Sequence, residues 1–140
     1  MSELKVRTRE TGAVAAMPDG RLPVITTPTG GKVELVTSVS QPGFNPLDLL
    51  YASVAACMAL SARIAAGKLG LREKLGDVRV EVTGDKTHES PSRIERFHIA
   101  FHFDGDLSAE EKQHIAELAE EICTVSNTLR SNPAFDLKVE

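Results

Sequence analysis

The longest apolar segment of the chain is Leu49–Ala62, in which no residue carries a charge. Upstream, Asn45 followed by Pro46 is a good N-terminal cap with a first-turn proline, and Gly70 downstream is a typical helix terminator. The pattern therefore predicts one long helix over residues 46–69. Nearly every side of this helix is apolar, so it needs cover all round, which favours a central, buried position.

Alternating apolar and polar residues predict short strands before this helix. Residues 3–9, the apolar run within residues 17–31, and residues 32–39 each fit a strand, and turn residues separate them. The first third of the chain is therefore expected to form a small meander or hairpin of three or four short strands.

A β-hairpin is predicted after the long helix. Residues 77–86 alternate valines with polar residues, which is typical of a half-buried antiparallel strand. Residues 94–105 alternate in the same way from Phe97 onward. Ile94 and Glu95 break this phase, so a bulge or a strand start is expected at these two residues.

The last third of the chain combines a helix with a short strand. Ser108 and Glu111 have the spacing of a capping box, and apolar residues then recur at helical spacing. The pattern leaves open whether this helix is continuous through Cys123 and Thr124 or breaks there. Residues 134–140 alternate again and predict a short edge strand.

The order of these elements indicates an α+β fold. A length of 140 residues suits a single domain, which is expected to cover residues 1–140. Five Phe, one Tyr and no Trp leave the core to aliphatic residues and alanine. Two helices and short strands supply little cover for a helix that is apolar on nearly every side, which favours a homodimer.

The charge of the chain argues against several classes of partner. The formal net charge is -4 and the pI is near 5.6, with no basic run, which argues against nucleic acid or an anionic membrane surface as the main partner. The uncharged run is shorter than the ~20 residues that span a bilayer. The N-terminus lacks the apolar core of a secretory signal, so a cytoplasmic protein is expected.

Metal and cofactor chemistry has little support in the sequence. His98 and His102 share a strand face but are separated by about 13 Å, which is too far for one ion. His88 lies in a predicted turn and His114 on a helix with polar neighbours. There is no HExxH or CxxC spacing, no phosphate-binding loop and no GxSxG elbow. We expect structural or solvated histidines, no metal and no cofactor.

The two cysteines are the remaining candidates for chemistry. Cys57 lies near the centre of the uncharged run, and the residues four positions before and after it are Ser53 and Ser61. This stripe predicts a small polar spot within a hydrophobic pocket. The alternative is that each serine bonds a carbonyl of its own helix and that the thiol is a small buried hydrophobe.

The setting of Cys123 depends on whether the last helix breaks. If it breaks, Cys123 or Thr124 opens a new helix, whose N-terminus favours a thiolate. If it is continuous, Cys123 lies one position past the apolar stripe and is partly buried. Neither cysteine has a histidine or lysine beside it in the sequence, so the activating charge must come from elsewhere in the fold.

Two segments, "FNPLDLLYASVAAC" (44–57) and "CTVSNTL" (123–129), resemble the OsmC/Ohr family, the osmotically inducible protein C and organic hydroperoxide resistance proteins. The resemblance implies an intertwined homodimer, with antiparallel sheets around a long central helix and sites at the subunit interface. It also implies a peroxidase for alkyl or fatty-acid hydroperoxides, with Cys57 as the peroxidatic residue and Cys123 as the resolving residue. A dithiol reductant would then reopen the Cys57–Cys123 disulfide.

The sequence departs from this family at the residues that activate the thiol. The family uses an arginine from the N-terminal region and a glutamate just after "NP". Here Pro18 stands at the arginine's place and Leu47 at the glutamate's place, so Arg21 and Asp48 are the nearest candidates. Two hypotheses follow: a working peroxidase of a divergent branch, and a non-catalytic small-molecule binder or redox sensor on the same fold.

Overall fold

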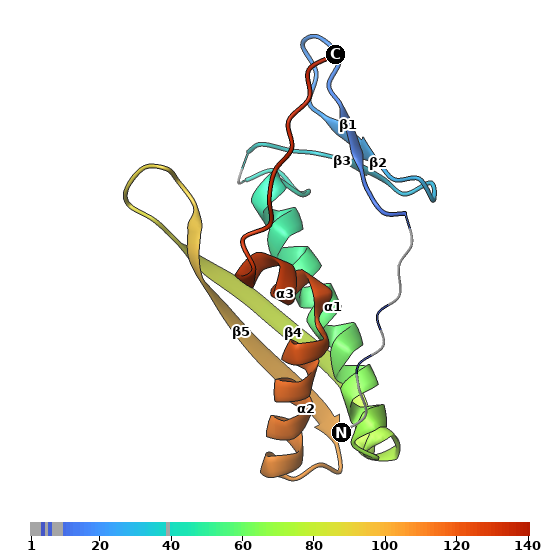
Figure 1. Cartoon of the computed structure of the whole chain (residues 1–140). Coiled ribbons are helices and arrows are strands. Elements are labelled where there is room, and N and C mark those ends of the chain that lie inside the picture. The colour runs from blue at the N-terminus through green and yellow to red at the C-terminus, as the bar shows by residue number, and fades with distance from the viewer. Residues whose placement is uncertain (1–3, 5, 7–9, 39) are drawn as a thin grey trace. The chain divides into compact units, whose positions relative to one another are not determined.

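The computed structural model describes residues 4, 6, 10–38 and 40–140, and the chain divides into two compact units, residues 1–50 and 51–140. The first unit holds a three-stranded antiparallel sheet in the order β1-β2-β3, formed by β1 (Val14–Ala16), β2 (Val24–Thr26) and β3 (Lys32–Glu34). The elements that follow are α1 (Pro46–Lys68), the 3₁₀ turn η1 (Arg72–Lys74), β4 (Leu75–Lys86), β5 (Ile94–Gly105), α2 (Ala109–Ile122) and α3 (Thr124–Arg130) (Figure 1). The predicted α+β class is confirmed.

The meander confirms the expected short strands, but its third strand is shorter than residues 32–39. The Leu35 N–H still donates to the Pro23 carbonyl at 3.1 Å, whereas the next N–H, of Val36, donates to the Phe44 carbonyl at 3.0 Å. The backbone therefore leaves the sheet here and pairs with the segment that leads into α1. The strand expected over residues 3–9 falls mostly on residues outside the described part of the chain.

Both ends of α1 are fixed by local hydrogen bonds, close to where the sequence predicted them. At the start, the Asp48 N–H donates to Asn45 Oδ1 at 2.9 Å, and the Asn45 N–H donates to Asp48 Oδ2 at 3.0 Å. At the end, the Leu71 N–H reaches the Ala66 carbonyl at 2.7 Å. Gly70 has a φ of 72°, a left-handed conformation that closes the helix without a Cβ clash.

The two sides of α1 differ sharply in burial. Met58, Ala62 and Ala65 are fully buried, whereas Leu60 and Ile64 on the other side are more than half exposed. With 23 residues, α1 is long and apolar enough to cross a membrane by length and composition alone. The uncharged run, which is only part of α1, is by itself too short to do so. A core helix of a globular protein passes the same test, and one face of α1 lies in the core of the second unit.

The strands β4 and β5 form an antiparallel ribbon (Figure 1). Its apolar face contributes to this core. Val82 pairs with Ile99 in the expected phase, and the register skips Glu95, so the bulge lies where the sequence predicted it. Phe103 of β5 and Ile115 of α2 belong to one buried cluster with the alanines of α1. The second unit is thus held together by α1, the ribbon and α2.

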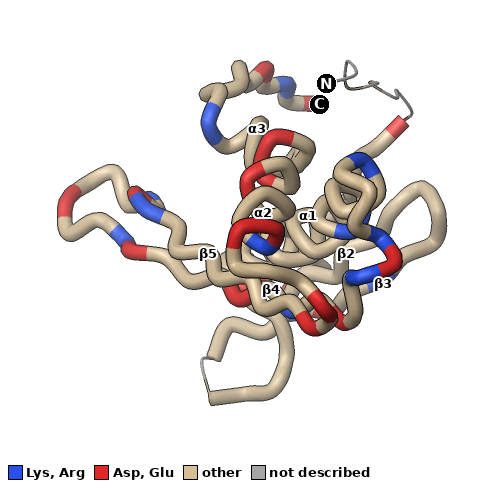
Figure 2. Tube along the Cα trace, turned by 90° about the horizontal axis from the view of Figure 1, so that it is seen from below, with Lys and Arg blue, Asp and Glu red and all other residues tan. Residues whose placement is uncertain are grey.

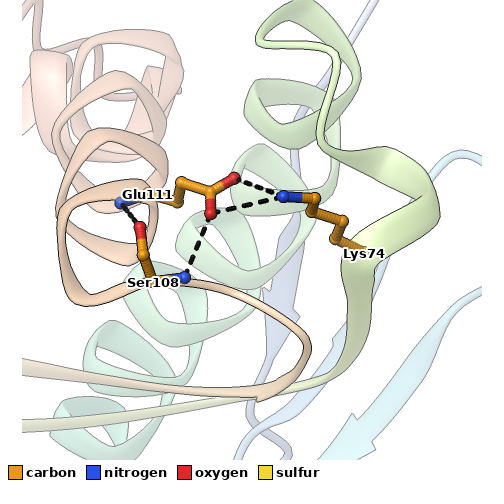
Figure 3. A network of polar contacts seen from close by, with 3 residues as sticks. All are labelled: Lys74, Ser108 and Glu111. Carbon is orange, nitrogen blue, oxygen red and sulfur yellow. Dashed lines mark hydrogen bonds and ion pairs between the residues drawn. The ribbon is translucent and has the colours of Figure 1, made fainter.

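The capping box predicted for α2 is present and is linked to the turn before β4. The Glu111 N–H donates to Ser108 Oγ at 3.0 Å, and the Ser108 N–H donates to Glu111 Oε1 at 3.1 Å. Lys74 Nζ lies 3.2 Å from Glu111 Oε2 (Figure 3). Acidic positions recur along α2 (Figure 2), so this helix offers no basic surface to a polyanion.

The strand predicted for residues 134–140 is wrong. These residues form neither helix nor strand, and Phe135, Leu137 and Val139 are 94%, 93% and 89% exposed. Among the described residues, no strand pairs with this segment. The alternation is real, but a strand also needs a neighbour with free backbone groups, which alternation alone cannot supply.

Candidate functional site

The structure brings the two cysteines together in the second unit. Cys57 lies in the middle of α1, and Cys123 lies between α2 and α3. Both belong to a cluster of core residues that includes Val54 and Met58. Both thiols are free, Cys57 is partly exposed, and Cys123 is fully buried. Cys57 packs against the buried cluster that contains Cys123, and hydrogen bonding from the Cys123 side chain lowers the pKa of Cys57.

The last helix breaks at Cys123, which settles the alternative that the sequence left open. Cys123 has a ψ of 106°, outside the helical range, so α2 ends before it and α3 begins at Thr124. Its sulfur accepts a hydrogen bond from the Ser126 N–H at 3.4 Å, as an N-cap side chain does. The break also turns the first N–H groups of α3 toward Cys57.

The environment of Cys57 favours its thiolate. Burial by itself raises the pKa of Cys57, but four hydrogen-bond donors act against burial and hold the pKa below its ordinary value. In decreasing order of effect, these donors are the Cys123 thiol, the Val125 N–H, the Ser61 hydroxyl and the Thr124 N–H. Each of these bonds is stronger to a negatively charged sulfur than to a neutral one.

The environment of Cys123 has the opposite effect. Burial, followed by the hydrogen bond to Cys57, raises the pKa of Cys123 to about 11. The Ser126 N–H only partly offsets this. Of the two sulfurs, Cys57 is therefore the one that ionises first. The sequence predicted that a helix opening at Cys123 or Thr124 would favour a thiolate at Cys123. The N–H groups at the start of α3 favour the thiolate of Cys57 on α1 instead.

The two serines predicted to form a polar spot around Cys57 lie in different settings, and a role of Ser53 at the thiol stays a prediction. Ser61 is 4% exposed and its hydroxyl interacts with the Cys57 sulfur. Ser53 lies on the exposed side of α1 and is not among the groups that shift the pKa of Cys57. Sequence reasoning missed the N–H groups of Thr124 and Val125, because backbone donors leave no trace in residue identity. The possible helix break near Cys123 was the one feature of the sequence that pointed to these N–H groups.

Arg21 and Asp48, the candidates for the activating pair, belong to the first unit, whereas the cysteines belong to the second. The Asp48 carboxylate accepts the Asn45 N–H in the cap of α1. Arg21 is exposed in a turn, where its N–H donates to the Pro18 carbonyl at 3.0 Å. A role for either residue at Cys57 therefore stays a prediction.

Three of the histidines lie beside carboxylates on the exterior of the second unit. His98 Nε2 is 2.8 Å from Asp85, and His114 Nε2 is 3.9 Å from Glu110. His102 is similarly close to Glu81. Within the described residues, no group of three His, Cys, Asp or Glu side chains is arranged to hold a metal ion.

Two cavities lie beside the cluster that contains the cysteines. Their volumes are about 590 Å³ and about 310 Å³, and both are lined by Phe97 and Ile99 of β5 and by Glu120 of α2. Met58 borders the larger cavity and Val54 the smaller one. Apolar and charged side chains share the lining of both cavities, and neither cysteine lines them.

Comparison with known proteins identifies relatives of this site and fold. A family model described as OsmC-like protein matches residues 39–138. A protein of Haloferax volcanii, described as uncharacterized, is 31% identical over 104 residues, which cover 74% of this chain and 76% of that protein.

Solved structures of organic hydroperoxide resistance proteins have a similar fold. The structure of an organic hydroperoxide resistance protein OsmC from Legionella pneumophila has a TM-score of 0.71 at 25% identity and covers 91% of this chain and 93% of that one. The structure of the organic hydroperoxide resistance protein OhrB of Bacillus subtilis has a TM-score of 0.68 at 23% identity. The match covers 89% of this chain and 93% of that one. The resemblance inferred from the two cysteine segments thus extends over the whole fold.

Proposed function

Since the chain belongs to the family of OsmC-like proteins, we propose that it is a thiol-dependent peroxidase that reduces alkyl or fatty-acid hydroperoxides to alcohols. The observation that carries this proposal is that both cysteines lie in one core cluster, where the more exposed of the two, Cys57, is also the one with the lowered pKa. The names of the compared structures support a role in resistance to organic hydroperoxides.

In the first step, the Cys57 thiolate attacks the outer oxygen of the hydroperoxide. The O–O bond breaks, Cys57 becomes a sulfenic acid, and the rest of the peroxide leaves as an alcohol after gaining a proton. The donors around Cys57 support this step because they keep a larger share of the sulfur ionised at neutral pH.

In the second step, the Cys123 sulfur attacks the sulfenic sulfur and displaces hydroxide, which gives a Cys57–Cys123 disulfide. The packing of Cys57 against the cluster that contains Cys123 supports this step, because it holds the two residues in the same part of the core. A dithiol reductant then returns both residues to thiols. No metal or cofactor is required for this cycle.

The surroundings of Cys57 suit an apolar substrate. Along α1, Cys57 is flanked by the exposed side chains of Leu60 and Ile64 and is backed by the buried Met58. An alkyl group that packs on these side chains loses contact with water, whereas hydrogen peroxide has no such group to bury. We therefore propose a preference for organic hydroperoxides, in a cytoplasmic homodimer in which the exposed side of α1 faces the partner subunit.

The test is thiol titration and mass spectrometry after one equivalent of cumene hydroperoxide, with hydrogen peroxide in parallel. We expect rapid loss of both thiols, a mass lower by the two hydrogens lost in a disulfide, and faster reaction with the organic peroxide. Cys57→Ser should abolish turnover, and sustained turnover by that variant would rule the proposal out.

Pro18 and Leu47 stand where the family has the arginine and the glutamate that activate the thiol. This difference favours one other function, a non-catalytic small-molecule binder or redox sensor on the same fold. This function requires a Cys57 thiol of ordinary reactivity. Persistence of both thiols in the experiment above, together with an ordinary pKa of Cys57 from the pH profile of alkylation, would favour it over the peroxidase.

A further inference from the structure

The larger of the two cavities lies between β5 and α2 and has a volume of about 590 Å³. Cavities of this size hold small organic molecules in many proteins. Neither cysteine lines this cavity, so the proposed peroxidase cycle leaves it without a role. What it can bind follows from the side chains of its two walls and from where the charges lie between them.

One wall is an apolar row on a single face of β5. It consists of the alternating residues Phe97, Ile99, Phe101 and Phe103. From the first to the last of these residues, the row is about 20 Å long at the usual rise of a strand. The fully buried Met58 of α1 extends the apolar surface at its base. Such a row suits an unbranched alkyl chain, which loses its contact with water along the whole length.

The facing wall is one side of α2, where Ala109, Lys112 and Ala116 follow one another at helical spacing. The two alanines are short, so they leave the side chain of Lys112 uncovered on this wall. Lys112 is only partly exposed, and in the described part of the chain no carboxylate forms an ion pair with it. Its ammonium group is therefore a cation that an anionic ligand can pair with.

The acidic side chains of the cavity have partners and lie farther along α2. Glu117 accepts a hydrogen bond from Gln113 Nε2 at 3.0 Å, and Glu120 forms an ion pair with Arg130. Glu117 and Glu120 follow Lys112 by about 7.5 and 12 Å along the helix axis. The end of the cavity at Lys112 is therefore the end that attracts a negative charge and repels a positive one.

The short turn between β5 and α2 sets the direction of the cavity (Figure 1). Residues 106–108 join the end of the strand to the start of the helix, so Phe103 and Lys112 lie at the same end of the cavity. Phe97 and Glu120 also border the smaller cavity, and they mark the opposite end. A head group at Lys112 therefore has the apolar row of β5 ahead of its chain.

We propose that this cavity is a binding site for an unbranched alkyl carboxylate, with the carboxylate at Lys112 and the chain along the apolar row of β5. The inference goes beyond the proposed function, because the site contains neither thiol and binding involves no covalent step. The carboxylate accepts a charge-assisted hydrogen bond from the Lys112 ammonium group, and burial of the chain supplies the rest of the affinity.

The test is isothermal titration calorimetry of the full chain with decanoate, decanol and decylamine, each below the concentration at which it forms micelles. These probes share a chain and differ in head group. We expect one decanoate to bind per chain, and decanol and decylamine to bind at least about tenfold more weakly, because neither pairs with the Lys112 charge. Dodecanoate should bind about tenfold more tightly than decanoate, since two further methylene groups are buried.

The variants test the position of the head group. Lys112→Gln removes the charge, so we expect it to weaken decanoate binding by about tenfold and to leave decanol binding unchanged. Lys112→Arg keeps the charge and should retain most of the affinity. Lys86→Gln, which removes an exposed lysine at the end of β4, is the matched control and should bind decanoate like the unaltered protein. Cys57→Ser should also bind it with unchanged affinity.

Equal affinities of Lys112→Gln and Lys86→Gln for decanoate would overturn the proposal, as would the absence of binding by the unaltered protein. Loss of binding in Cys57→Ser would place the chain at the thiol and overturn it as well. Failure of the protein to react with hydroperoxides would count against the proposed function alone, because decanoate binding requires no reaction at Cys57.

Discussion

At the scale of single residues, the hydroxyl of Ser61 determines part of the reactivity of Cys57. It lies one helical turn from Cys57 on α1, is almost completely buried, and stabilises the ionised sulfur. A helical serine often bonds a carbonyl of its own helix, as Thr128 does with the Thr124 carbonyl at 2.7 Å. For Ser61, the interaction found in the described residues is with the thiol.

We predict that Ser61→Ala raises the pKa of Cys57 by about 0.5–1, since one hydrogen bond contributes about 1 kcal/mol. At a fixed pH below that pKa, alkylation by iodoacetamide should slow in proportion to the lost thiolate. The measurement is the pH profile of alkylation followed by mass spectrometry. Ser53→Ala is the control and should keep the original profile. An unchanged profile in Ser61→Ala would show that the hydroxyl does not act on the sulfur.

The sequence identified both cysteines but not what activates the first of them. Cys57 and Cys123 were found because thiols are rare in this chain and carry chemistry of their own. The amides of Thr124 and Val125 could not be found, because any residue supplies an N–H and only the backbone angle at Cys123 directs these two toward Cys57. Residue identity predicts side-chain chemistry, but it does not predict backbone donors.

At the scale of secondary-structure elements, the ribbon and α1 approach each other closely at Gly84. Gly84 pairs with Phe97, whose ring contacts Tyr51 edge to face with centroids 6.1 Å apart. A Cβ at Gly84 would lie 2.7 Å from the Tyr51 hydroxyl and 2.8 Å from Ile94 Cγ2. The absence of a side chain at Gly84 is what lets α1 and the ribbon approach here.

We predict that Gly84→Ala lowers the free energy of unfolding by about 1–3 kcal/mol, because the added methyl group displaces Tyr51 or Ile94. The matched control is Gly67→Ala in the last turn of α1, where a Cβ meets no atom within 4 Å. That variant should gain up to about 1 kcal/mol from helix propensity. Urea unfolding followed by circular dichroism measures both. Equal stability of the two variants would contradict the close approach.

Elements with local signals were predicted well, and those that depend on a distant partner were not. The caps of α1 and α2 and the bulge at Glu95 all follow from neighbours in the sequence. The end of β3 depends on Phe44 instead, and the strand expected over residues 134–140 has no neighbour in the described chain. Alternation defines the two faces of a strand and leaves its pairing undefined.

At the scale of the whole molecule, large apolar side chains remain exposed on several elements. On α1 they include Leu60 at 62% and Ile64 at 51%, and near the C-terminus Phe135 and Leu137 are almost fully exposed. Leu60 and Ile64 are one helical turn apart and share an exposed face, which favours an interaction surface on α1. The sequence predicted a helix that needs cover all round, and the second unit covers one face of it. The homodimer proposed above would cover the other face.

We predict that the protein is a dimer by size-exclusion chromatography with light scattering, and that Leu60→Asp shifts it toward a monomer. A charge in an apolar interface is costly unless it is paired. Thr83→Asp, which adds the same charge on the polar face of β4, should leave the dimer intact. A monomeric unaltered protein, or the same dimer affinity in both variants, would show that the exposed side of α1 is not the interface.

The unequal exposure of the two sulfurs also gives the reducing half of the proposed cycle a direction. A reductant thiolate must approach in line with the S–S bond, and only the Cys57 sulfur has a surface open to it. The mixed disulfide therefore forms on α1, and Cys123 is always the sulfur released into the interior. A covalent complex trapped between this protein and its electron donor would be joined through Cys57, whichever reductant serves it.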